Sequence, residues 1–368
     1  MIINLQLMNF RNFGEKTIEF SNGLTIIVGD NGVGKTNILE AVNLLATGKS
    51  FKASVEAEML RYGEEIARIS GVVSSRQNVE SKETHTTDYI LHTTNCEAIL
   101  TVGNNGWPKK RLLVNGVPKR LIDFAGNFKT VLFGPWDMDL VTSSPSLRRR
   151  FLDTVLSQVD REYRRSILSY EKGLRQRNRL LFRIREEGLS RSQLVFWNQL
   201  LIKNGDYILT KRQEFIEFVN SLGKVKLEYD KSVISEGRLE QYKDAEVAAA
   251  TTLVGPHRDD FIFQKINDKQ SLAGVAGKNA NAKSLSAFGS RGEQRMGVLW
   301  LKMAELAFIE QQTHEKPTFL LDDIFSELDH EHRKIVLDSI ENRQVIMTTA
   351  DIHTISNVKS KNVKIIKL

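Results

Sequence analysis

A glycine-rich stretch at residues 29–36 carries the residue types that bind phosphate groups in proteins. It matches the pattern G-x-x-x-x-G-K-[ST] at every fixed position. The glycines let backbone N–H groups close around phosphate oxygens, the lysine reaches the β- and γ-phosphates, and the last hydroxyl binds Mg²⁺. The stretch therefore predicts a nucleotide site. The predicted contacts are Gly29, Asp30, Asn31, Gly32, Val33, Gly34, Lys35 and Thr36.

A pair of acids near the C-terminal end supplies groups that the glycine loop lacks. Residues 318–321 are apolar or β-branched and end in Asp322 and Asp323. A carboxylate at the end of a strand can hold the same Mg²⁺ as Thr36, and its neighbour can orient and activate the attacking water. Alone, the pair would indicate a cap or turn after a core strand. Together with the loop it predicts a catalytic group of Asp323, Asp322 and Lys35, with Thr36 and Asp322 as metal ligands.

A third stretch could bind phosphate from outside its own helix. Residues 289–295 open a predicted helix, and the hydroxyl of Ser290 and the backbone N–H groups around Gly292 lie at its start. Helix N-termini attract anions because their N–H groups are free and the helix dipole is positive there. We therefore expect Ser290 and Gly292 to contact nucleotide phosphate.

The elements that must position these residues follow from the hydrophobic periodicity. Residues 24–28 are typical of a buried strand, and apolar residues recur at helical spacing after Thr36. Residues 66–132 predict antiparallel strands, with Asn-Gly turn signals at 105–106 and 115–116. From Ser144 onward the spacing predicts two long helices, which form a helical hairpin at about 145–222 with a turn at 188–190.

Composition narrows the class of protein. The chain has 368 residues and one cysteine, Cys96, so it can form no disulfide within itself and suits a reducing cytoplasm. It has no run of 18 apolar residues and its first residues lack the form of a signal peptide. We therefore expect a cytoplasmic protein without a membrane partner.

Positive charge is concentrated in one segment. Residues 148–191 hold 13 Lys and Arg against 6 Asp and Glu, an excess equal to the net charge of +7 for the whole chain. This concentration favours a polyanion partner such as DNA, although a solvated helix face would show the same composition.

The order of these motifs resembles the ABC-type ATPase head of the SMC class, and within it the RecF family of bacterial DNA replication and repair proteins. The stretches that carry the resemblance span nearly the whole chain. They are residues 9–13, 29–41, 48–52, 145 with 148–153, 255–260, 289–295 and 321–329. The runs Arg-Arg-Arg-Phe-Leu-Asp at 148–153 and Gly-Pro-His-Arg-Asp-Asp at 255–260 distinguish this family from transporter ATPases.

The resemblance implies an α/β fold: an ABC/SMC-type P-loop ATPase head with a mixed sheet and helices, and a mainly helical arm inserted between its two halves. The expected division is a head of residues 1–134 and 285–368 and an arm domain of residues 135–284. It also implies ATP and Mg²⁺ as cofactors. Two copies would close on ATP as a homodimer, with the loop 29–36 of one copy facing Ser290 and Gly292 of the other.

The implied function is ATP-dependent DNA binding in recombinational repair and replication. The closed dimer would bind single-stranded DNA and gapped duplex at gap junctions, and slow ATP hydrolysis would release it. The family's partners are RecR and RecO, which help to place the recombinase RecA on DNA. This chain departs from the pattern at Glu293, where a neutral residue is more usual, and at Asp323, where many such ATPases have glutamate.

Three alternatives to this function fit the sequence less well. Another SMC-like or ABC-type ATPase could have a different DNA or membrane partner, but a transporter subunit would place its acid pair much closer to Lys35. A fused nuclease would need an acidic metal-binding domain, and only 17 residues follow Asp351. A non-enzymatic scaffold would not need Lys35, Thr36, Asp322 and Asp323 intact.

Other residues have two interpretations each. His257 suggests a structural or DNA-contact role more than a metal ligand. The run at 148–150 could contact phosphate or pair with acids at the base of the arm. Trp107 and Trp136 are expected to pack rather than to stack on bases. The strongest arm candidates for DNA contact are Arg175, Arg177, Arg179, Arg183 and Arg185.

Overall fold

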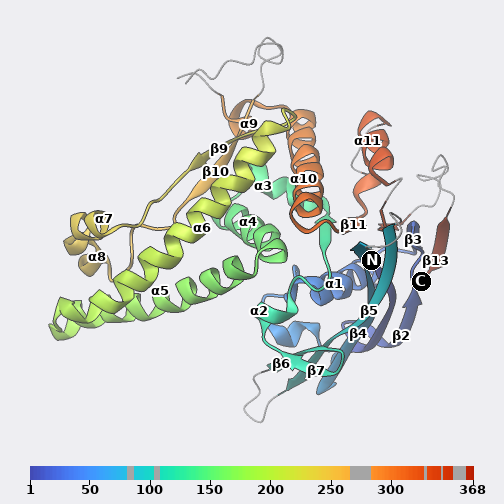
Figure 1. Cartoon of the computed structure of the whole chain (residues 1–368), viewed down its shortest axis with the longest axis horizontal. Helices are drawn as coiled ribbons and strands as arrows, with labels where there is room; N and C mark the ends of the chain where they lie inside the picture. Colours follow the sequence, from blue (N-terminus) through green and yellow to red (C-terminus); the bar gives the residue numbers. More distant parts are fainter. Residues whose placement is uncertain (81–86, 103–107, 266–282, 327–329, 341–342, 351–361) are drawn as a thin grey trace. The chain divides into compact units, whose positions relative to one another are not determined.

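The computed structural model describes residues 1–80, 87–102, 108–265, 283–326, 330–340, 343–350 and 362–368 (Figure 1). The chain forms two compact units. Unit 1 comprises Met1–Asp137 and Ile309–Leu368, and unit 2 comprises Met138–Phe308. The chain thus leaves unit 1 once and returns to it, as an inserted segment requires. The head and arm boundaries expected from the sequence stay a prediction.

Unit 1 contains a six-stranded antiparallel sheet in the order β2-β1-β4-β5-β6-β7. A tight turn joins the first two strands, with Phe10 opposite Phe13. The long strands β4 and β5 pair along their whole length, so the antiparallel region predicted at 66–132 is confirmed as far as residue 119. Beyond it the prediction is wrong, because helix α2 follows and β8 pairs in parallel within the second sheet. The strands are β1 (Ile2–Phe10), β2 (Phe13–Glu19), β4 (Ile66–Glu80), β5 (Thr87–Val102), β6 (Pro108–Val114) and β7 (Val117–Lys119).

The second sheet of unit 1 is parallel and has the order β13-β3-β12-β11-β8. Its central strands β3, β12 and β11 are almost wholly buried, which explains why their sequences are continuous apolar runs rather than alternating ones. The carboxyl ends of parallel strands meet at one edge, where ligands bind in such sheets. The strands are β3 (Leu24–Val28), β8 (Thr130–Phe133), β11 (Thr318–Asp322), β12 (Val345–Thr349) and β13 (Val363–Lys367).

Helix α1 (Lys35–Thr47) forms the centre of unit 1, because it contacts strands of both sheets. Residues Ile38 to Ala46 are all buried on it, and the apolar ones among them join one hydrophobic core with side chains from each sheet. A helix covered on two sides is apolar almost all round. The remaining elements of this unit are η1 (Glu56–Met59), α2 (Leu121–Phe124), η2 (Pro135–Met138), η4 (Ile324–Ser326) and α11 (His330–Ile340).

Unit 2 is built on two long antiparallel helices, α5 (Arg161–Glu187) and α6 (Val195–Ser221), which lie side by side in Figure 1. They approach closely at Gly173, where a Cβ atom would lie 2.5 Å from Leu200. The hairpin predicted at about 145–222 is thus confirmed, with one difference. Asp160 accepts hydrogen bonds from the backbone of Glu162 and Tyr163, so it caps α5 and separates it from α4 (Pro145–Val159).

The other elements of unit 2 are short apart from the last helix. They are α3 (Asp139–Thr142), η3 (Arg191–Leu194), β9 (Lys226–Asp230), α7 (Glu236–Gln241), α8 (Lys243–Ala249), β10 (Asp260–Gln264), α9 (Leu285–Phe288) and α10 (Arg291–Thr313). Strands β9 and β10 pair as an antiparallel ribbon. Among the described residues, no helix is both long and apolar enough to cross a membrane.

Candidate functional site

The glycine loop at 29–36 lies between β3 and α1, as its sequence predicts. Gly34 precedes α1 with φ at 106°, which a residue with a side chain rarely adopts. A Cβ atom there would also lie 2.6 Å from the amide of Asn12. That amide donates a 2.8 Å hydrogen bond to the carbonyl of Val33, so the turn between β1 and β2 holds the loop in place.

Lys35 is folded back across the loop and is 7% exposed. Its Nζ atom donates to the carbonyl oxygens of Gly29 at 2.6 Å and Asp30 at 3.0 Å. The ammonium group therefore lies against the same backbone that would surround a phosphate. Phosphate oxygens offer stronger charge-assisted acceptors than carbonyls do, so a nucleotide could take over these hydrogen bonds.

Thr36 and Asp322 meet at the carboxyl edge of the parallel sheet. The hydroxyl of Thr36 donates a 2.7 Å hydrogen bond to Oδ2 of Asp322. The other carboxylate oxygen, Oδ1, accepts a 2.6 Å hydrogen bond from the hydroxyl of Thr348 on β12. Asp322 is 5% exposed, and both its oxygens are oriented by neighbouring hydroxyls. The structure thus brings together two residues that the sequence predicts as metal ligands.

Asp323 follows β11 in a left-handed conformation, with φ at 47°. Aspartate tolerates this conformation better than most residues because its short polar side chain can bond locally. Its backbone N–H lies 3.1 Å from the hydroxyl of Thr348 and 3.2 Å from the Thr348 carbonyl. Thr348 therefore contacts both acids of the pair. In the sequence, Thr348 is one of several polar residues at the end of the apolar run 345–347, where ligands bind in parallel sheets, but its contact with the acid pair is not predicted.

Hydrogen bonds also anchor α1 to two neighbouring stretches of unit 1, mainly through the buried side chain of Glu40. Glu40 is fully buried and accepts two hydrogen bonds from the guanidinium of Arg11, at 2.8 and 2.6 Å. Ser50 donates a third, at 2.5 Å. Lys52 reaches Asn37 at 3.1 Å. These bonds connect residues 9–13 and 48–52 to the helix after the glycine loop, so both stretches help to hold that helix in place.

Ser290 and Gly292 belong to unit 2, whereas the glycine loop and the acid pair belong to unit 1. At the start of α10, the backbone N–H of Ser290 donates to the carboxylate of Glu293 at 2.7 Å. In return the hydroxyl of Ser290 accepts from the backbone N–H of Glu293 at 3.2 Å. This is a reciprocal capping box. The hydrogen bond from Lys265, at 2.9 Å, and that from Ser290 lower the pKa of Glu293 to about 2.

The runs at 148–153 and 255–260 are two sides of one ion-pair network within unit 2. Arg148 forms a two-pronged pair with Asp260, at 2.7 and 2.8 Å. Arg149 donates to the carbonyl of Asp259 at 2.7 Å. Arg212, 2% exposed, pairs with both Asp153 and Asp259 at 2.7 Å. The structure therefore supports the interpretation as pairing with an acid at the base of the arm for Arg148, whereas Arg149 donates to a backbone carbonyl.

His257 has a structural environment. Its Nε2 lies 3.0 Å from the carbonyl of Thr252, and its Nδ1 lies 2.8 Å from the hydroxyl of Tyr170. Because a carbonyl only accepts, Nε2 carries the proton and Nδ1 accepts from Tyr170. Burial lowers the pKa of His257 to about 4, so the ring is neutral at pH 7. Within the described residues, no three His, Cys, Asp or Glu side chains gather as a metal cluster.

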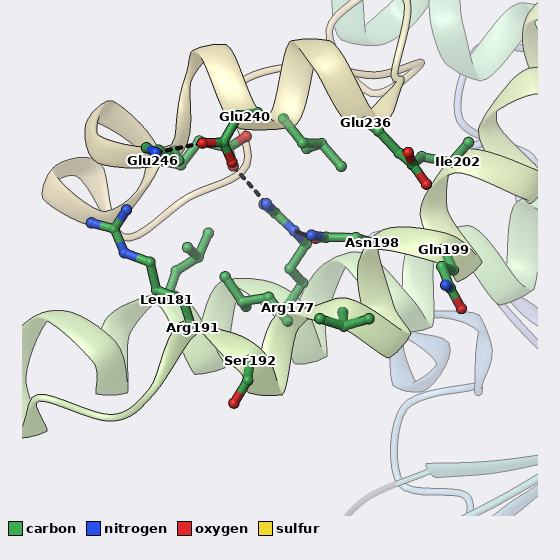
Figure 2. A pocket seen from close by; sticks show the side chains of 14 residues that line it. Arg177, Leu181, Arg191, Ser192, Asn198, Gln199, Ile202, Glu236, Glu240 and Glu246 are labelled. Carbon is green, nitrogen blue, oxygen red and sulfur yellow. Dashed lines mark hydrogen bonds and ion pairs between the residues drawn. The ribbon is translucent and has the colours of Figure 1, made fainter.

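Arg177 is wrongly placed among the DNA-contact candidates. It extends from α5 into a pocket of about 480 Å³ that helices α5 to α8 and η3 line (Figure 2). There it pairs with Glu246 at 2.6 Å and donates to Asn198 and Thr252. Its side chain is 3% exposed. The spacing Tyr163–Tyr170–Arg177 repeats every seven residues and could have shown that Arg177 shares the buried face of α5.

The two tryptophans have different outcomes. Trp136 stacks on Phe51 with ring centroids 5.0 Å apart, which confirms a packing role. Trp107 lies outside the described residues. So do Asp351, residues 327–329 and most of the expected linker at 273–283.

Comparison with known proteins gives one consistent result. The chain matches the model of the RecF/RecN/SMC N terminal domain over residues 1–367. It is 34% identical to the DNA replication and repair protein RecF of Lachnoclostridium phytofermentans over 384 residues, which covers 100% of this chain and 98% of the relative. The same-named protein of Bacillus cytotoxicus is 32% identical over 391 residues, covering 99% and 96%.

Two solved structures of a recombination mediator protein RecF of the RecFOR pathway are also similar, each with 29% sequence identity. The one described as RecF-ATP superposes with a TM-score of 0.79 and covers 98% of this chain and 94% of that one. The one described as RecF-ATPrS has a TM-score of 0.78 and covers 96% and 93%. The fold expected from the sequence is therefore confirmed over nearly the full chain.

Proposed function

The chain belongs to the RecF family of DNA replication and repair proteins, and we propose on this basis that it is an ATP-dependent DNA-binding protein of recombinational repair. The observation that carries the proposal is the cluster of Lys35, Thr36 and Asp322 behind a glycine loop of the right conformation. The similar RecF structure with ATP supports ATP as the nucleotide.

The metal site fits Mg²⁺. Octahedral Mg²⁺ binds oxygen at about 2.0–2.1 Å, which places adjacent ligands about 2.9 Å apart. The Thr36 hydroxyl and Asp322 Oδ2 are separated by 2.7 Å, close to that spacing. Both are the hard oxygen donors that Mg²⁺ prefers. When bound, Mg²⁺ would neutralise phosphate charge, while Thr36 and Asp322 hold it and Lys35 binds the phosphates.

Asp323 is the proposed group that orients and activates water, with Asp322 and Lys35 as the other catalytic residues. The backbone N–H of Asp323 is held by Thr348, which fixes the point of the chain from which the Asp323 carboxylate would reach the water. The shorter reach of aspartate compared with glutamate suits slow hydrolysis. ATP turnover would then act as a timed switch rather than as a source of rapid work.

Ser290 and Gly292 would complete the site in a second copy of the chain. The glycine loop of one protomer would face the start of α10 in its partner, with ATP between them. A helix N-terminus favours an anion, and the phosphate would have to displace the Glu293 carboxylate from the backbone N–H of Ser290. ATP binding would therefore close a homodimer, and hydrolysis would open it.

The closed dimer would bind DNA at gap junctions, where single strands meet duplex. The excess of Lys and Arg in residues 148–191 supports this partner. The similar structures are of a recombination mediator protein of the RecFOR pathway, which supports RecR and RecO as partners and RecA loading as the outcome. We also propose a cytoplasmic location, in keeping with the single cysteine.

The test measures DNA binding and nucleotide binding together. Fluorescence anisotropy on a gapped duplex would be recorded with and without ATP and Mg²⁺ for the wild type, Lys35→Ala and the control Lys119→Ala. ATP should strengthen binding by the wild type and by Lys119→Ala, whose side chain is an exposed cation of the same unit. Lys35→Ala should not respond. If ATP leaves wild-type binding unchanged, the proposed coupling is wrong.

A further inference from the structure

The two faces of α5 differ in kind. One face carries its buried residues, which recur at spacings of three and four and pack into unit 2: Tyr163, Ser166, Tyr170, Gly173, Arg177, Leu181 and Ile184. The opposite face carries Lys172, Arg175, Arg179 and Phe182, all exposed. Their spacing of three, four and three residues places these four side chains along one stripe of the helix.

The three cations of this stripe have no ion-pair or hydrogen-bond partner in the described part of the chain. Three other exposed arginines of α5 pair with acids of the same helix. Arg165 pairs with Glu162 at 3.3 Å, Arg183 with Glu187 at 3.0 Å and Arg185 with Glu186 at 2.7 Å. Along this part of α5, the cations without a partner among the described residues are therefore Lys172, Arg175 and Arg179.

An aromatic side chain ends the stripe. Phe182 is 49% exposed, and the guanidinium of Arg185 lies 5.4 Å from its ring centroid. Exposing a large apolar ring to water is unfavourable, so a flat partner surface that covers the ring of Phe182 would gain free energy. Nucleic-acid bases are such partners, because every base presents a π-face that stacks on aromatic side chains.

We propose that Lys172, Arg175, Arg179 and Phe182 form a track for a DNA strand, in which the three cations contact successive phosphates and Phe182 stacks on the first unpaired base. The stripe spans eleven residues, or about 15 Å of helix. Laid along the axis of a duplex, that length covers about four base-pair steps of about 3.4 Å each. A duplex end continued by a single strand offers both backbone and unstacked base within this length.

This inference rests on the proposed DNA-binding function and specifies its surface. An acidic protein could also be attracted to three free cations, but it would not account for an exposed aromatic ring in line with them. Stacking explains the ring and the cations together. The track would therefore recognise the junction itself, because blunt duplex offers phosphates without an accessible internal base.

The first experiment compares two variants of the full chain with equal loss of charge. The track variant replaces Lys172, Arg175 and Arg179 by Gln. The control variant replaces three exposed lysines of unit 2 outside α5 by Gln, namely Lys203, Lys224 and Lys231. Binding to a gapped duplex with ATP and Mg²⁺ is measured by anisotropy at several salt concentrations, and circular dichroism checks that each variant is folded.

The track variant should bind at least about tenfold more weakly, and its slope of log affinity against log salt should decrease by roughly two to three. The control should bind within about threefold of the wild type. Equal losses in both variants would show that only net charge matters and would overturn the track. Unchanged binding by the track variant would also overturn it while leaving the proposed function intact. Absence of wild-type binding would instead refute the proposed function.

The second experiment tests the ring. Phe182→Ala is compared with Phe196→Ala, an exposed phenylalanine on α6, on gapped duplex and on blunt duplex of equal length. The Phe182 variant should lose most of the preference for the gapped substrate, and 2-aminopurine placed at the first unpaired position should no longer be quenched on binding. Retention of both the preference and the quenching would exclude stacking by Phe182.

Discussion

Thr348 donates a 2.6 Å hydrogen bond from its hydroxyl to the carboxylate of Asp322. The same hydroxyl lies 3.1 Å from the backbone N–H of Asp323. One buried side chain thus orients the proposed metal ligand and the backbone of the proposed catalytic acid. Because Thr348 acts through these two acids, we assign it a positioning role.

Thr348→Val should separate ATP binding from hydrolysis. Valine keeps the shape of the side chain but removes a hydrogen bond to a charged group, which is worth about 1.5–3 kcal/mol. We expect kcat for ATP to fall by roughly 10- to 100-fold while KM changes little. Thr348→Ser restores the hydroxyl and should recover most of kcat. Equal loss in both variants would indicate that the methyl group and packing matter instead.

Glu293→Gln should strengthen ATP-driven dimerisation. Glu293 holds the backbone N–H of Ser290 at 2.7 Å, the donor that a phosphate from the partner would need. A carboxylate competes with and repels that phosphate, whereas Gln can still complete a capping box. Analytical ultracentrifugation with ATP and Mg²⁺ should show a dimer that forms at several-fold lower protein concentration. A weaker dimer would mean that Glu293 supports the contact rather than competing with it.

Arg212→Met should destabilise unit 2. It would leave the fully buried Asp259 without its ion pair, and burial already raises the pKa of this acid. Removing one partner of a buried pair costs about 3–5 kcal/mol. Thermal unfolding of the full chain would measure the loss, with Arg183→Met as control. Arg183 is exposed and pairs only with Glu187, so its replacement should change stability by about 0.5 kcal/mol or less.

The sequence predicts those parts of the site that local spacing determines. The loop at 29–36 is recognisable because the glycines, the lysine and the hydroxyl are all fixed by one tight turn before a helix. The cap at Asp160 is equally local, since Asp before a charged helical turn is a common N-cap. It was overlooked because apolar residues continue at helical spacing on both sides of it.

The contacts that the sequence does not predict depend on register between distant strands or on burial. Thr348 lies beside Asp322 because β11 and β12 pair in parallel with these two residues opposite each other. A shift of one residue would have placed Thr349 there instead. Arg177 differs from Arg175 and Arg179 only in the side of the helix it occupies, so counting charge along the segment could not separate them.

Acid should weaken unit 2 through His257. Its pKa is about 4 in the folded chain, lowered chiefly by burial, against about 6.5 when unfolded. The unfolded chain therefore binds the proton more tightly, and this stabilisation is complete above pH 6.5 and is lost as pH falls through 4. The loss approaches roughly 3 kcal/mol. Thermal unfolding between pH 7.5 and 5 should show a slope that His257→Gln reduces. An imidazole pKa near 6.5, measured by NMR in the folded chain, would contradict this, because the folded and unfolded chains would then bind the proton equally well.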